Sequence, residues 1–149
     1  VGIISLMIAV LAQIFLIYNR LNREQGYLTS DTLEAKEIGI KLEKSMALSK
    51  YVYISNTSTT LTIETDKYEF IIKNYNSLNT PKQFIIQEKE TGKEKIRNIS
   101  KYLYFVANTY YNLPRLYEVK IYVYNRYSYK TRKILIKKLA YYISVVKYY

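Results

Sequence analysis

The chain has 149 residues, enough for one globular domain plus an additional apolar segment. It contains no cysteine and no histidine, which excludes a disulfide framework, thiolate chemistry, nearly every zinc site and every histidine-based acid–base mechanism. Its formal net charge of +11 is typical either of a protein with acidic partners or of a lysine-rich surface that faces solvent.

Residues 1–18, VGIISLMIAVLAQIFLIY, carry no charge, and only Ser5 and Gln13 are plainly polar. A helix over 3–18 would span roughly 24 Å, a little less than a typical membrane span. An apolar helix of this kind is not stable alone in water, so we expect lipid or other protein to cover it. Because the first residue is Val1 and not Met, we also expect a longer precursor to have been processed or trimmed.

An amphipathic pattern follows over residues 19–49. Apolar side chains recur at helical spacing, at Leu21, Leu28, Ala35, Ile38, Leu42 and Met46. The pattern predicts one long helix from about residue 2 to residue 48, with a bend near Gly26. Alternatively, Ser30 or Asp31 caps a second helix and Glu34 completes a capping box.

The charged face of this segment also carries an expected contact. Glu37 and Lys41 are four residues apart, and they are predicted to form an ion pair on the helix surface.

After Lys50 the apolar pattern changes from helical spacing to alternation. Thr91-Gly92 and Asp66 mark hairpin turns. We therefore predict an α+β fold with a helical segment at 1–49 and an antiparallel, sandwich-like β domain at 50–149. The expected strands are 51–55, 60–65, 67–73, 83–90, 93–99, 101–111, 117–127, 129–137 and 139–146.

Catalytic motifs are missing from the sequence. Four glycines exclude both the dinucleotide-binding fingerprint and the Walker A loop, and no metal-ligand spacing occurs. Acidic residues such as Glu64, Asp66 and Glu88 fall at the expected hairpins, where charged side chains face water. We expect neither an enzyme nor a cofactor.

Basic and aromatic residues alternate in the last third of the chain, a composition typical of surfaces that stack single-stranded bases and contact phosphates. A tyrosine-rich sheet with a lysine-rich solvent face has the same composition. The candidate surface comprises Tyr124, Arg126, Tyr127, Lys130, Arg132 and Lys133.

Two N-x-S/T sequons occur, at Asn56 and Asn98. Sequons matter only in an exported chain, where both are expected to carry glycans in turns.

A retained apolar N-terminal helix, an amphipathic continuation and an all-β domain follow one another in this chain. This order resembles type IV pilins, the archaeal branch in particular. Gly2-Ile3 followed by Ser5 is similar to the start of archaeal pilins, whereas the glutamate that bacterial pilins carry near the N-terminus is absent.

The resemblance implies a subunit that is anchored in the membrane before assembly and then packs its helix in the core of an extracellular filament of identical subunits. Small residues there would let neighbouring helices approach closely. The expected core residues are Gly2, Ile3, Ser5, Leu6, Ala9, Ala12, Gln13, Phe15 and Leu16.

The implied roles are surface adhesion, cell–cell aggregation or motility, with DNA exchange as a further one. Two alternatives stay open. The chain is either a membrane-anchored basic module that binds nucleic acid or anionic surfaces, or a virion coat protein with a helical core.

Overall fold

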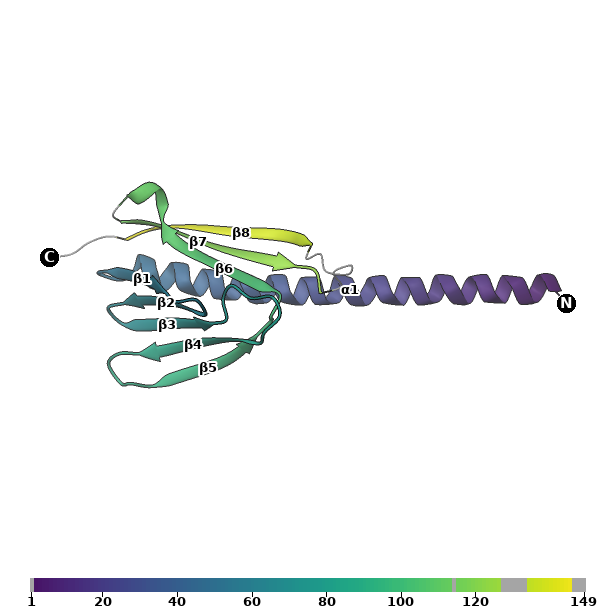
Figure 1. The fold of residues 1–149 in the computed structure, drawn as a ribbon, viewed down its shortest axis with the longest axis horizontal. Helices are drawn as coiled ribbons and strands as arrows, with labels where there is room; N and C mark the ends of the chain where they lie inside the picture. The colour runs from purple at the N-terminus through teal and green to yellow at the C-terminus, as the bar shows by residue number, and fades with distance from the viewer. Residues whose placement is uncertain (1, 114, 127–133, 146–149) are drawn as a thin grey trace.

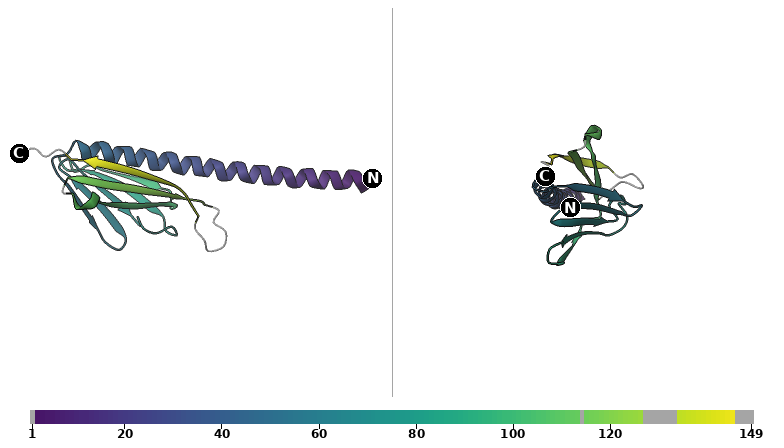
Figure 2. Two further views of the ribbon diagram at one scale, coloured as in Figure 1. Left: turned by 90° about the horizontal axis from the view of Figure 1, so that it is seen from above. Right: turned by 90° about the vertical axis from the view of Figure 1, so that its left-hand side faces the viewer.

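The computed structural model describes residues 2–113, 115–126 and 134–145. A single helix, α1 (Gly2–Ala47), forms a straight rod, and two β-sheets pack around its C-terminal half (Figure 1). At 1.5 Å per residue, the helix is about 69 Å long. Its N-terminal half projects beyond the sheets into open space, as Figure 1 and the left view of Figure 2 show.

The helix is continuous because its sequence offers nothing that would break it. The first proline of the chain is Pro81, and most side chains before residue 48 are good helix formers. The one cluster of weak formers is accommodated, since Thr29 Oγ1 donates a hydrogen bond to the Gln25 carbonyl at 2.9 Å. One helix is therefore confirmed, and the alternative of a second helix capped at Ser30 or Asp31 is wrong.

Each sheet is an antiparallel meander in which consecutive strands pair. The larger sheet contains β1 (Val52–Asn56), β2 (Thr60–Thr65), β3 (Tyr68–Lys73), β4 (Lys82–Glu88) and β5 (Glu94–Ile99). The smaller sheet contains β6 (Leu103–Thr109), β7 (Leu116–Tyr124) and β8 (Leu135–Ser144), with the 3₁₀ turn η1 (Tyr110–Asn112) between β6 and β7. The predicted α+β class is confirmed.

The core lies where the helix meets the inner faces of both sheets. Alternate residues of β2 and β7 point inward, so that Leu61 and Ile63 are buried on one sheet and Val119 and Ile121 on the other. The helix contributes four buried apolar residues to this cluster, Ala35, Ile38, Leu42 and Met46. Residues 35–46 and the sheets thus share one hydrophobic core.

The end of the chain differs from the prediction. Strands were expected at 129–137 and 139–146 with a break at Lys138, but β8 runs from Leu135 to Ser144 without interruption. Lys137 and Lys138 pair with Val123 and Tyr122 of β7. Two adjacent lysines keep their backbone donors and carry no fixed turn conformation, so they do not end a strand. Residues 129–133 lie outside the described residues.

Candidate functional site

The apolar N-terminal half of α1 is the most unusual surface of the molecule. Every described residue from Gly2 to Tyr18 is exposed, with Ile3 at 77% and Leu16 at 66%. Twelve large apolar side chains are exposed here: Ile3, Ile4, Leu6, Met7, Ile8, Val10, Leu11, Ile14, Phe15, Leu16, Ile17 and Tyr18. They surround the helix on all sides, so one flat contact would leave most of them in water.

The residues predicted for a filament core all lie on this projecting segment. Gly2, Ser5, Ala9 and Ala12 are spaced by three or four positions and so share one face of the helix. A Cβ added at Gly2 would meet no atom, which shows that the helix surface there is open. The larger members, Ile3, Leu6, Phe15 and Leu16, are exposed beside this narrow small-residue face.

The helix is long and apolar enough here to cross a membrane, as judged by its length and composition. Its sequence is therefore compatible with a membrane anchor. Whether lipid or other protein surrounds this segment, the twelve exposed side chains must be removed from water. Burying each of them contributes about 1.5–3 kcal/mol of favourable free energy.

An ion pair connects the helix to the end of β7. Asp31 is buried on the core stripe of α1, and both of its carboxylate oxygens accept hydrogen bonds from Arg126, at 2.9 and 2.6 Å. The guanidinium also covers the ring of Tyr27, 4.5 Å from its centroid. The hydrogen bond to Asp31 raises the pKa of Arg126 above its ordinary value, so this side chain stays charged.

The ion pair between Arg126 and Asp31 involves a residue of the predicted basic and aromatic surface. The charge of Arg126 is matched by a buried carboxylate, so its guanidinium is held against the helix. Tyr124 is half-buried at the end of β7. Tyr127, Lys130, Arg132 and Lys133 lie outside the described residues.

A different basic and aromatic face does exist on the outer side of the smaller sheet. Tyr104 and Tyr122 are cross-strand partners whose rings make an edge contact at 6.1 Å, and Lys138 lies over the Tyr122 ring at 6.0 Å. Tyr110 packs edge-on against Tyr142 of β8 at 5.0 Å. This face was not predicted from the sequence, because its members come from η1 and three strands, and alternation within one strand does not show which strands will be neighbours.

A second set of contacts joins the helix to β5. Arg97 pairs with Glu37 at 2.9 Å and with Glu34 at 3.6 Å, while the other Glu34 oxygen accepts the backbone N–H of Ser100 at 2.6 Å. The predicted Glu37–Lys41 ion pair is therefore wrong. Arg97, brought in by β5 from a distant part of the sequence, offers Glu37 a planar donor group that outcompetes the lysine on the same helix.

Both sequons are at strand ends and not in turns, which corrects the expected placement. Asn56 is the last residue of β1, is exposed, and donates a hydrogen bond to Tyr75 Oη at 3.3 Å. Asn98 is exposed on β5 and accepts one from Gln83 Nε2 at 3.4 Å. Both side chains are reachable from solvent.

Within 2–113, 115–126 and 134–145, no three acidic side chains come together in a way that could hold a metal ion. Glu64, which the sequence places at a hairpin, pairs with Lys89.

Searches against models of protein families, curated proteins and solved structures found no match to this chain.

Proposed function

We propose that this chain is the structural subunit of an extracellular helical filament similar to type IV pili, assembled through the N-terminal half of α1. The observation that carries the proposal is the exposure of twelve large apolar side chains around a helix that projects from a folded domain. Burying them would release on the order of 20 kcal/mol, which is more than the net stability of a typical domain. A surface of this size is a strong driving force for association.

Several copies of the helix packed side by side would cover every side of each copy. The small-residue face formed by Gly2, Ser5, Ala9 and Ala12 supports close packing, because small side chains let helix backbones approach. When such contacts join two different faces of the helix and the rotation between copies does not close into a ring, they extend into an open helical polymer. Lipid would cover the same residues before assembly.

The continuous helix supports the same arrangement. Because α1 is rigid and carries the β-sheets only on its C-terminal half, many helices can be bundled at the centre with their sheets on the outside. The sheets, with the exposed sequons Asn56 and Asn98, would then form the outer surface that meets other cells or substrates.

The test is to place a charge in the proposed helix bundle. Ala9→Lys and Ala12→Lys should abolish filaments, because a lysine there would be buried among apolar helices at a cost of several kcal/mol. Thr80→Lys, at an exposed loop position of the β domain, is the matched control and should polymerise normally. Filaments are scored by electron microscopy after detergent removal, and circular dichroism checks that the sheets remain folded.

Normal filaments from Ala9→Lys and Ala12→Lys would contradict the proposal. If the unaltered chain remains as single copies in lipid vesicles under all conditions, a membrane-anchored module would replace the filament subunit as the explanation.

A further inference from the structure

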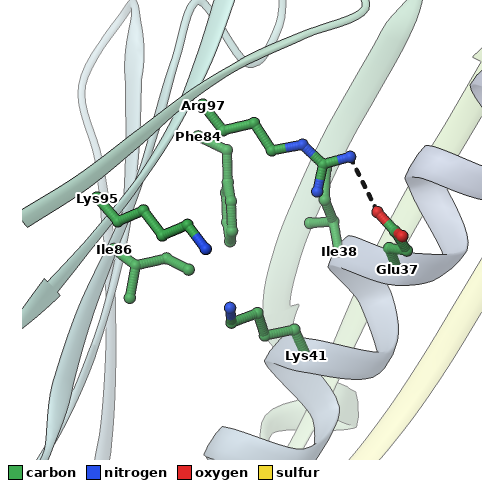
Figure 3. A pocket seen from close by; sticks show the side chains of 7 residues that line it. All are labelled: Glu37, Ile38, Lys41, Phe84, Ile86, Lys95 and Arg97. Atoms are coloured by element: carbon green, nitrogen blue, oxygen red, sulfur yellow. Dashed lines mark hydrogen bonds and ion pairs between the residues drawn. The ribbon is translucent and has the colours of Figure 1, made fainter.

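A groove lies between α1 and the outer strands of the larger sheet (Figure 3). Its first part is a cavity of about 290 Å³. The floor is apolar, formed by Ile38 of the helix and by Phe84 and Ile86 of β4. Strand β5 forms the opposite wall and is the edge strand of its sheet.

The groove continues along the helix into a second cavity of about 410 Å³. Lys41, Ile86 and Lys95 line both parts, so they mark the junction. Beyond the junction, the side chains of Tyr68 and Phe70 extend the apolar surface. Each part is close to the size of a small-molecule site, and the combination of an apolar lining with a few polar groups is typical of one.

Two positive charges meet at this junction. The ammonium groups of Lys41 and Lys95 point into the groove from opposite walls, over the Phe84 and Ile86 side chains (Figure 3). Across the described ranges, neither lysine takes part in an ion pair, because the nearby carboxylate of Glu37 is taken by Arg97. Two like charges that face one space repel each other, and an anion between them would reverse this repulsion.

The charges elsewhere in the groove restrict where an anion fits. Glu88 and Glu94 line the second cavity together with Lys93, so acidic and basic groups alternate there. The junction is therefore the place where positive charge is uncompensated, and the apolar surfaces extend from it in both directions.

We propose that this groove binds an organic carboxylate with an apolar body. The carboxylate lies between Lys41 and Lys95, and the body lies along Phe84 and Ile86. The two ammonium groups supply charge-assisted hydrogen bonds, which are about twice as strong as neutral ones. The inference is independent of filament assembly, since the groove lies on the β-domain half of α1.

The experiment uses 2-naphthoate as the probe and the full chain in phosphatidylcholine nanodiscs, with empty nanodiscs as the blank. Titration calorimetry or ligand-observed NMR should show saturable binding. 2-Naphthalenemethanol, which keeps the rings and lacks the charge, should bind at least roughly tenfold more weakly, as should acetate, which lacks the apolar body.

Two variants locate the site. Lys41→Met and Lys95→Met keep the length of the side chain and remove the charge, and each should weaken 2-naphthoate binding about tenfold. Lys36→Met, at an exposed position one turn earlier on the same helix, is the matched control and should bind as the unaltered chain does.

Three results would overturn the proposal: no saturable binding above the blank, equal binding of the alcohol and the carboxylate, or unchanged affinity when both lysines are replaced. The comparison of probes on the unaltered chain remains decisive even if a variant fails to fold.

Discussion

Lys82 is buried on the core face of β4. Its side chain is only 1% exposed, and within the described part of the chain its Nζ has no hydrogen-bond partner. Burial lowers its pKa from 10.5 to about 8, because a charged ammonium loses its hydration there. Keeping this ammonium charged at neutral pH therefore costs on the order of 1–3 kcal/mol.

Replacing Lys82 should therefore stabilise the fold. Lys82→Met keeps the length of the side chain and should raise the free energy of unfolding at pH 7 by about 1–3 kcal/mol. The unfolded chain holds the proton of Lys82 up to pH 10.5, whereas the folded chain releases it near pH 8. Between pH 8 and pH 10.5 the free energy of unfolding of the unaltered chain therefore rises relative to that of Lys82→Met. The difference in stability between the two chains should shrink over this range.

Urea unfolding followed by tyrosine circular dichroism in a non-ionic detergent measures this difference. Lys73→Met, at an exposed position at the end of the neighbouring β3, is the control and should show no such dependence. An advantage of Lys82→Met that stays constant from pH 7 to pH 10.5 would disprove the effect of burial on the pKa.

At the scale of elements, α1 and β8 approach each other closely at Gly39. A Cβ at this position would overlap the ring of Tyr141 and come within 2.6 Å of its Oη. Gly39 is buried, so the strand crosses the helix where the helix has no side chain. The residue is retained in a helix interior despite its poor propensity because the contact needs the space.

Two glycines on the same helix should therefore respond in opposite ways to alanine. Gly39→Ala should destabilise the chain by about 1–3 kcal/mol, since Tyr141 must move. Gly26→Ala has open space around it and should stabilise the helix by about 0.5–1 kcal/mol. Thermal unfolding of both variants compares them directly. A Gly39→Ala variant as stable as Gly26→Ala would show that the tyrosine ring yields without cost.

Elements differ in how far the sequence predicts them. The helix and the β2–β3 and β4–β5 hairpins follow from local signals: helical spacing, alternation, and the turn at Gly92, which has a positive φ of 71°. Of the apolar stripe that the sequence shows, Ala35, Ile38, Leu42 and Met46 are buried, whereas Leu21 is exposed because the sheets do not reach it.

Contacts between elements were harder to predict. Glu37 was assigned to Lys41 on its own helix and pairs instead with Arg97, and the ion pair of Arg126 with Asp31 was not predicted. Both partners are distant in sequence, and no local pattern encodes which strand a helix will meet. The groove between Lys41 and Lys95 is equally a product of that packing.

At the scale of the whole molecule, the boundary between the exposed apolar segment and the folded domain lies within α1. Residues 2–27 lie outside the hydrophobic core, whereas Leu28 packs against it and four residues between Ala35 and Met46 are part of it. The folding unit therefore includes the second half of the helix.

Two truncations test this division. A chain that begins at Glu24 should be monomeric and soluble without detergent, because the twelve exposed apolar residues of the projecting segment are gone and the core is complete. A chain that begins at Lys50 should fail to fold, because it loses Ala35, Ile38, Leu42 and Met46 from the core, and a single such loss commonly costs 2–5 kcal/mol. Size-exclusion chromatography and circular dichroism measure both. A folded chain from Lys50 onward would show that the sheets are self-sufficient.

The segment of α1 between Tyr18 and Tyr27 also sets a minimum distance between the apolar segment and the β domain. The helix rises about 14 Å over this interval, so an upright helix holds the described part of the β domain at least that far from any boundary at Tyr18. The Debye length at physiological salt is about 8 Å. If a membrane ends at Tyr18, the positive charge of the sheets is thus largely screened from that membrane and acts on what approaches from the opposite side.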